Sequence, residues 1–229
     1  MVYLIPSFLS DESVETIPVY ILDAVKDCQV IFAENERTAR RFLKSICKEI
    51  VIDDYEWHTI HKVEKEQINT LKQKIKERKN IAIISEAGCP GIADPGQILI
   101  HEAQKLNAVV KPLVGPSSIL LALMASGLNG QQFCFAGYLP IDNMERNKKI
   151  KQLEEESIQK KSTQIFIETP FRNNRIVEAV LQNCKPATQL CIAVDITSPR
   201  EVIKTKTVAE WKNEKIDLHK KPAIFLLMG

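Results

Sequence analysis

The 229-residue sequence contains no apolar run close to the roughly 18 residues that a membrane-spanning helix needs. Its first residues also lack the basic segment and the long apolar core of a secretory signal peptide. We therefore expect a protein with no membrane segment, in the cytoplasm.

Neither charge is in clear excess, because 31 basic residues face 29 acidic ones and the formal net charge is +2. This balance excludes a protein that is basic all over, as many nucleic-acid binders are, but it allows a local basic face. The six cysteines form no CxxC pair, which argues against a zinc site or a disulfide framework and favours reduced cysteines. His58 and His61 have no third ligand nearby in the sequence, so we expect no metal.

What the sequence does contain is a regular alternation of short apolar runs and helical patterns, which predicts an α/β fold. In the first half, strands are expected at residues 2–5, 29–33, 49–52, 80–84 and 108–112, with helices between them. This order implies a mainly parallel sheet with helices on both faces. In the second half, strands are expected at 132–136, 163–168, 189–195, 201–207 and 223–228. We place two domains, a parallel-sheet α/β domain at 1–114 and a mixed-sheet α/β domain at 115–229.

One loop stands out, at residues 85–96 with the sequence SEAGCPGIADPG. It follows an apolar strand and holds three glycines, two prolines and the acids Glu86 and Asp94. Glycine lets a ligand approach the main chain, and loops at the carboxyl ends of parallel strands are where α/β sheets bind ligands. The density of these residues favours a ligand site over an ordinary connection between a strand and a helix.

A second loop, Val114-Gly-Pro-Ser-Ser118, precedes an apolar helix rich in small residues. Ser117 is placed as the N-cap of that helix. The free amide groups of the first turn allow two interpretations, a simple cap or a contact with the polar edge of a ligand.

Several stretches together resemble the tetrapyrrole methylase family of S-adenosylmethionine-dependent methyltransferases. SEAGCPGIADPG resembles that family's SDAGTPGISDPG, and VGPSS followed by SGL resembles PGPSA and SGL. Further matches, in the family's order, are FCFAGYLP with F-x-F-x-G-F-L-P, IFIETPFR with FYESPHR, and AENERTARRFL with AEDTRHTRKLL. The similarity is closest to the branch that methylates a ribose 2′-hydroxyl of 16S ribosomal RNA.

The resemblance implies two α/β domains with a cofactor cleft between them, a homodimer, and S-adenosylmethionine as cofactor. It implies cofactor contacts, largely through backbone groups, at Ile5, Pro6, Glu86, Gly88, Pro90, Ile92, Ser117, Ser118, Glu168, Thr169, Pro222 and Ala223. Ribosomal RNA or a ribosomal subunit would be the partner.

The sequence departs from the ribosomal RNA branch at several positions. The loop from Pro6 to Ser10 has no glycine where that branch has TPIGNL, and Glu86 and Phe171 replace an Asp and a His. Ser198 and Arg200 stand where the branch has a Lys and a His. If those side chains grip or deprotonate a ribose hydroxyl, this chain must do so differently.

A hydroxyl acceptor must lose a proton, and the candidate bases are the carboxylates after predicted strands, Glu34, Glu86, Glu168 and Asp195. None of them is singled out, because a structural role fits each as well. Two basic groups are candidates for RNA contact: Arg37, Arg40, Arg41 and Lys44 on one predicted helix, and Arg172 and Arg175 on another.

RNA is the favoured acceptor. A small molecule such as a tetrapyrrole is the alternative substrate. A third interpretation is a paralogue that binds the cofactor without catalysis.

Overall fold

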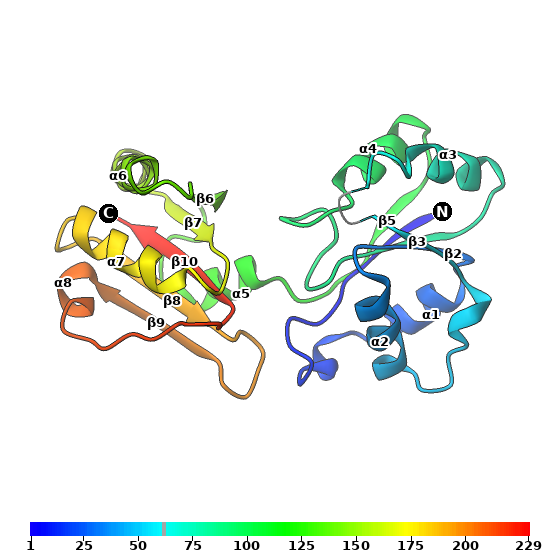
Figure 1. The fold of residues 1–229 in the computed structure, drawn as a ribbon, viewed down its shortest axis with the longest axis horizontal. Coiled ribbons are helices and arrows are strands. Elements are labelled where there is room, and N and C mark those ends of the chain that lie inside the picture. The colour runs from blue at the N-terminus through cyan, green and yellow to red at the C-terminus, as the bar shows by residue number, and fades with distance from the viewer. Residues whose placement is uncertain (61–62) are drawn as a thin grey trace. The chain divides into compact units, whose positions relative to one another are not determined.

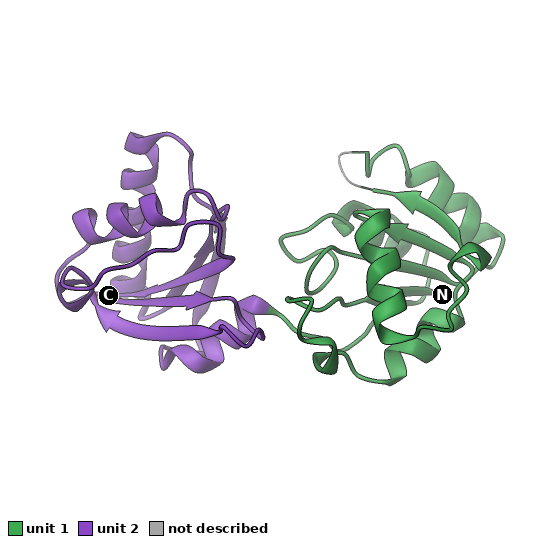
Figure 2. Cartoon of the chain, turned by 60° about the horizontal axis from the view of Figure 1, so that its bottom comes forward, with its two compact units in different colours: residues 1–117 green, residues 118–229 purple. Residues whose placement is uncertain are grey.

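The computed structural model describes residues 1–60 and 63–229, so His61 lies outside the described residues. The chain divides into two compact units, residues 1–117 and 118–229, coloured separately in Figure 2. The domain ranges inferred from the sequence, 1–114 and 115–229, remain a prediction.

Unit 1 is built on a five-stranded sheet in the order β3-β2-β4-β1-β5. Its strands are β1 (Val2–Ile5), β2 (Val30–Ala33), β3 (Glu56–Thr59), β4 (Ile81–Ile84) and β5 (Val110–Pro112). Every pairing is parallel, as the alternating pattern predicted. The carboxyl ends of the three neighbours β4, β1 and β5 therefore lie at the same end of the strands, which we call the loop edge.

Helices cover both faces of this sheet because its central strands are apolar on both sides. They are α1 (Tyr20–Lys26), α2 (Glu36–Ile46), α3 (Ile68–Lys76) and α4 (Gln97–Lys105). One apolar core packs α1 and α2 against the sheet, and a second packs α3 and α4 against its other face. Figure 1 shows these two helix pairs on opposite sides of the strands. Asn35 caps α2 as predicted, since its side chain accepts hydrogen bonds from the amides of Arg37 and Thr38.

The third strand was predicted at the wrong place. Residues 49–52 do not form a strand; Ile50 is buried and a short 3-10 turn, Ile52–Asp54, follows. The strand is β3, which carries Trp57 and His58 and pairs with β2 at the edge of the sheet. An edge strand has only one strand neighbour, so it tolerates polar residues that a central strand would not.

Unit 2 contains the mixed five-stranded sheet that was expected, in the strand order β6-β7-β10-β8-β9. Its strands are β6 (Phe133–Tyr138), β7 (Thr163–Ile167), β8 (Gln189–Val194), β9 (Val202–Thr207) and β10 (Ala223–Met228). Only β6 and β7 are parallel; the other pairs are antiparallel. The last strand of the chain thus lies at the centre of the sheet.

Three helices, α6 (Asn143–Lys160), α7 (Asn173–Asn183) and α8 (Val208–Trp211), share one apolar core with this sheet. The helix α5 (Ser118–Ser126) lies against the other face, where Thr205 donates a hydrogen bond to the carbonyl of Ser126 at 2.7 Å. Within the described residues, no helix is both long and apolar enough to cross a membrane.

Candidate functional site

The prominent loop after β4 is tied to the loop after β1. Ser7 and Gly88 exchange two backbone hydrogen bonds of 2.9 and 3.1 Å, and the hydroxyl of Ser7 donates to the carbonyl of Ser85 at 2.7 Å. Gly88 adopts a φ of +73°, which disfavours any residue with a side chain. The first loop therefore forms a fixed part of the site although it lacks the glycine of the related loop.

A third loop, after β5, contacts the loop after β1. A Cβ added to Gly115 would lie 2.2 Å from Cβ and 2.3 Å from Cγ of Pro6. Only glycine allows the Pro6 ring to lie this close to the backbone at position 115. Since β4, β1 and β5 are neighbours in the sheet, the predicted contacts Pro6, Gly88 and Ser117 belong to loops at one edge. Ser117 lies directly before α5, as the N-cap prediction requires.

The far end of the loop after β4 is held by a residue that the sequence did not indicate. One carboxylate oxygen of Glu64 accepts hydrogen bonds from the amides of Gly96, Ile98 and Leu99 at 3.0, 2.8 and 3.1 Å. These amides open α4, and a carboxylate is favourable at a helix N-terminus. Gly96 has a φ of +117°, so glycine is required there too. The loop is thus fixed at both ends.

Acidic side chains lie together at the loop edge of unit 1. Glu34 follows β2 and accepts the amide of Glu86 at 3.0 Å, and Thr38 donates to the carboxylate of Glu86 at 3.2 Å. Burial, together with the nearby charges of Glu34 and Glu86, raises the pKa of the Asp94 carboxyl from 3.8 to about 7. Asp94 was expected in this loop, but its coupling to Glu34 was not predictable from the sequence, because Glu34 follows a different strand.

In unit 2, Glu168 follows β7 and its side chain is 1% exposed. One of its oxygens accepts the amide of Thr169 at 2.6 Å and pairs with Arg172, whereas the other has no hydrogen-bond partner among the described residues. Asn173 is fully buried, and its amide donates to the carbonyl of Lys221 at 2.7 Å, but its Oδ1 has no partner in the described part of the chain either. Near the start of α7, residues 1–60 and 63–229 thus offer no donor to two buried acceptor atoms.

The segment before β10 lies beside this loop. The amide of Lys220 donates to the carbonyl of Pro170 at 3.1 Å, and the amide of Asp195 donates to the carbonyl of Pro222 at 3.0 Å. Pro222 is exposed and Ala223 is half-buried. The predicted contacts Glu168, Thr169, Pro222 and Ala223 thus come from two loops of unit 2 that are joined through hydrogen bonds, whereas Ser118 opens α5.

Comparison with known proteins places the chain in a family. The model of the Tetrapyrrole (Corrin/Porphyrin) Methylases matches residues 13–212, most of the chain. The chain is a member of that family. It is an S-adenosylmethionine-dependent methyltransferase, which confirms the activity and the cofactor that the resemblance implied.

Curated relatives of this methylase carry the name ribosomal RNA small subunit methyltransferase I. The protein from Buchnera aphidicola of Acyrthosiphon pisum is 29% identical over 100% of this chain and 79% of its own length. The Bacillus subtilis protein is 28% identical over 93% of this chain and 70% of its own length. The Haemophilus influenzae protein is 31% identical over 72% and 58%.

Solved structures confirm the two-unit α/β fold of the methylase. The methyltransferase CobJ superimposes with a TM-score of 0.63 at 15% identity, covering 94% of this chain and 89% of that chain. Uroporphyrin-III C-methyltransferase from Thermus thermophilus, in complex with S-adenosylhomocysteine, gives a TM-score of 0.58 at 16% identity, covering 99% and 96%.

The residues of this methylase fit its cofactor in two ways. S-adenosylmethionine carries a positive sulfonium and an ammonium, and the carboxyl groups of Glu34, Glu86 and Asp94 give the loop edge of unit 1 a negative potential. The cofactor also carries amino and hydroxyl donors, which suit the unpartnered acceptors of Glu168 and Asn173 in unit 2. When bound, the cofactor supplies an activated methyl group. The chain's part is to bind and orient the reactants.

The basic residues proposed for RNA contact differ in their surroundings. Arg40 pairs with Glu36 at 2.5 Å and lies over the ring of Trp57, Arg41 lies 3.5 Å from Asp11, and Lys44 donates to the carbonyl of Lys48 at 2.9 Å. Arg172 is engaged by Glu168. Within the described part of the chain, only the exposed Arg37 and Arg175 of the six have no hydrogen bond or ion pair from the side chain.

Asp94 makes the stability of the methylase depend on pH. Its pKa of about 7 exceeds its ordinary value of 3.8, so the folded state holds this proton more tightly than the unfolded state. The contribution is fully present below pH 3.8 and is lost as the pH rises through about 7. In urea unfolding between pH 4 and 8, the free energy of unfolding of Asp94→Asn is expected to fall less with rising pH than that of the wild type. At pH 8 the variant should be more stable than the wild type by about 1–2 kcal/mol, after discounting for solvent screening.

The exposed Asp11 serves as the control, because Asp11→Asn removes a carboxylate at the surface of the same unit. Its pH profile should follow that of the wild type. Identical profiles for Asp94→Asn and wild type would show that folding does not raise the pKa of the Asp94 carboxyl.

Proposed function

We propose that this methyltransferase modifies RNA, at a ribose hydroxyl of the small-subunit ribosomal RNA. The observation that carries the proposal is the similarity to enzymes named ribosomal RNA small subunit methyltransferase I along the whole length of this chain. The ordered series of motifs, from Ala33 at the end of β2 to Arg172 after β7, supports the same assignment, whereas the loop after β1 departs from it.

The chain contributes to such a reaction in two ways. Fixed loops around Gly88 and Gly115 orient the reactants without reorganising. The acidic group at the loop edge offers a proton acceptor, and Asp94, with a pKa of about 7, exchanges a proton near neutral pH. Glu168 is committed to Arg172, so it is a weaker candidate for the base than Glu34, Glu86 or Asp94.

Transfer of a radiolabelled methyl group tests the proposal. The purified protein is incubated with labelled S-adenosylmethionine and, in separate reactions, with protein-free 16S ribosomal RNA, assembled small subunits, a transfer RNA, and a tetrapyrrole such as uroporphyrinogen. Label in the ribosomal RNA, located to a 2′-O-methyl nucleoside after digestion, is the expected result. Label only in the tetrapyrrole would assign the alternative substrate, and label in no acceptor would refute the proposal.

The enzyme is also proposed to be a homodimer. The strand β6 lies at the edge of its sheet, and large apolar side chains are exposed on it and just after it, namely Phe133, Tyr138, Ile141 and Met144. Open sheet edges and apolar patches are features of surfaces that a second copy covers.

Light scattering should give the mass of a dimer for the wild type and of a monomer for Phe133→Glu combined with Met144→Glu. Val19→Glu is the control, because Val19 is exposed on unit 1, whereas β6 belongs to unit 2. A dimer that survives the double substitution would exclude this surface as the interface.

We also place the enzyme in the cytoplasm. All six cysteines are free thiols, and three of them are buried, which suits a reducing compartment. Ribosomal RNA, the proposed substrate, is found there.

A further inference from the structure

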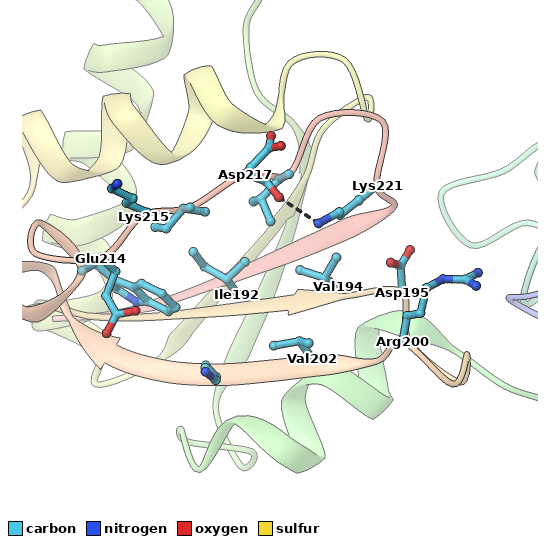
Figure 3. Close-up of a pocket in the computed structure, with 13 residues that line it drawn as sticks. Ile192, Val194, Asp195, Arg200, Val202, Glu214, Lys215, Asp217 and Lys221 are labelled. Atoms are coloured by element: carbon cyan, nitrogen blue, oxygen red, sulfur yellow. Dashed lines mark hydrogen bonds between the residues drawn. The ribbon is translucent and has the colours of Figure 1, made fainter.

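Unit 2 has a pocket of about 430 Å³ that contains none of the predicted cofactor contacts. It lies on the face of the sheet that carries α7 and α8, between β8 and β9 on one side and the segment of residues 214–218 on the other. Figure 3 shows Ile192, Val194 and Val202 along the strands that form its floor.

The floor follows from the strand register. Ile192 lies opposite Lys204, and Val194 lies opposite Val202, so these four side chains share one face. Ile192 and Val194 are buried, but Val202 on the edge strand β9 is 46% exposed. Because an apolar floor remains open to solvent beside the core, this pocket differs from an ordinary polar surface groove.

The rim is charged, with four basic and three acidic side chains: Arg200, Lys204, Lys215 and Lys221, and Asp195, Glu214 and Asp217. Two of the carboxylates are already engaged, since Glu214 pairs with Lys206, and Asp217 accepts from Asn174 at 3.1 Å and from the amide of His219 at 3.0 Å. Within the described part of the chain, the ammonium groups of Lys204 and Lys215 have no hydrogen bond or ion pair. The hydrogen bond from Lys206 and, to a smaller extent, the charge of Lys204 lower the pKa of the Glu214 carboxyl, but four basic groups against three acidic ones leave the rim with positive charge for an anion.

A ligand for this pocket needs a flat apolar part, an anionic group and hydroxyl or amino donors. The flat part would lie on Ile192, Val194 and Val202, as nucleobases stack on apolar side chains. The anion would meet Lys204 and Lys215, and the donors would meet Asp195. The volume is at the lower end of the range for small-molecule sites, about 300–1,000 Å³, and suits one nucleotide.

We propose that this pocket binds a nucleotide, with the base on the apolar floor and the phosphate at Lys204 and Lys215. The nucleotide is either free or one unit of an RNA strand. In the second case the inference rests on the proposed RNA substrate, and the pocket would hold a nucleotide outside the reacting one.

Calorimetric titration of the full-length protein tests the pocket. The probes are cytidine 5′-monophosphate, cytidine, ribose 5-phosphate and a tetracytidylate; a pyrimidine avoids competition with the adenosine part of the cofactor. We expect the monophosphate to bind more tightly than either fragment, and more weakly at higher salt. Tighter binding of the tetracytidylate would assign the pocket to RNA, and equal or weaker binding would assign it to a free nucleotide.

Two variants test whether the monophosphate binds in this pocket. Lys204→Glu reverses one charge at the rim and should weaken binding of the monophosphate by about tenfold or more. Val202→Trp fills the floor and should abolish binding; tryptophan suits an exposed strand position, and a melting curve confirms folding. Lys151→Glu, at an exposed position on α6 away from the pocket, is the matched control and should bind as the wild type does.

The proposal fails if the monophosphate does not bind at millimolar concentration, or if both pocket variants bind it unchanged. It also fails if S-adenosylhomocysteine displaces the monophosphate, because the pocket would then belong to the cofactor site. The proposed function is tested apart from this, by methyl transfer. Binding of the monophosphate without RNA methylation would refute only the RNA substrate, and RNA methylation without binding would refute only the pocket.

Discussion

Gly115→Ala is expected to weaken the binding of S-adenosylhomocysteine at least about tenfold and to lower the free energy of unfolding by about 1–3 kcal/mol. The new Cβ would lie 2.2 and 2.3 Å from two ring atoms of Pro6. A pyrrolidine ring cannot rotate away, and Gly115 precedes Pro116, which restricts its own backbone. The strain must therefore move one of two loops at the candidate site.

Calorimetry with S-adenosylhomocysteine and urea unfolding measure the two effects. Gly130→Ala is the matched control, because nothing lies within 4 Å of a Cβ added there. Combining Gly115→Ala with Pro6→Gly removes the obstructing ring atoms and should restore part of the binding, as expected for residues in direct contact. Unchanged binding in Gly115→Ala would show that the contact of these loops has no part in holding the cofactor.

Apolar patterning predicted most of the sheets. Ile81–Ile84 is buried at every position, because helices cover both faces of the sheet around it, and a continuous apolar run reveals such a strand. The edge strand β3 carries the polar pattern of Glu56–Thr59 and was missed for that reason. Whether a strand lies at an edge depends on the pairing of the whole sheet, and local sequence does not contain that information.

The site was predictable where glycine and proline mark the backbone, and not where distant residues meet. The loop around Gly88 was identified from composition and from its family motif. The cap that Glu64 provides for α4 joins residues more than thirty positions apart, so no local capping pattern reveals it. The pocket over Val202 was missed because its floor depends on the pairing of β9 with β8, and the sequence VIKTKT places Val202 on the same face as Lys204 and Lys206.

Arg172→Ala is expected to lower the free energy of unfolding by about 3–5 kcal/mol, because it leaves the carboxylate of Glu168 without its partner. The Glu168 side chain is 1% exposed and that of Arg172 is 22% exposed, so little water reaches the pair. Arg175→Ala is the matched control on the same helix, since Arg175 is exposed; it should change stability by less than about 0.5 kcal/mol.

The double variant Glu168→Gln with Arg172→Met separates the structural role of Arg172 from contact with RNA. It removes both charges together, so we expect it to be more stable than Arg172→Ala in urea unfolding. If Arg172 acts only by pairing with Glu168, the double variant should methylate RNA with the KM of the wild type. Arg175→Ala, in contrast, should raise the KM for RNA if that exposed guanidinium contacts phosphate. A raised KM in a well-folded double variant, with unchanged affinity for S-adenosylhomocysteine, would instead show that Arg172 itself contacts the RNA. Stability equal to that of the wild type in Arg172→Ala would contradict the buried pair.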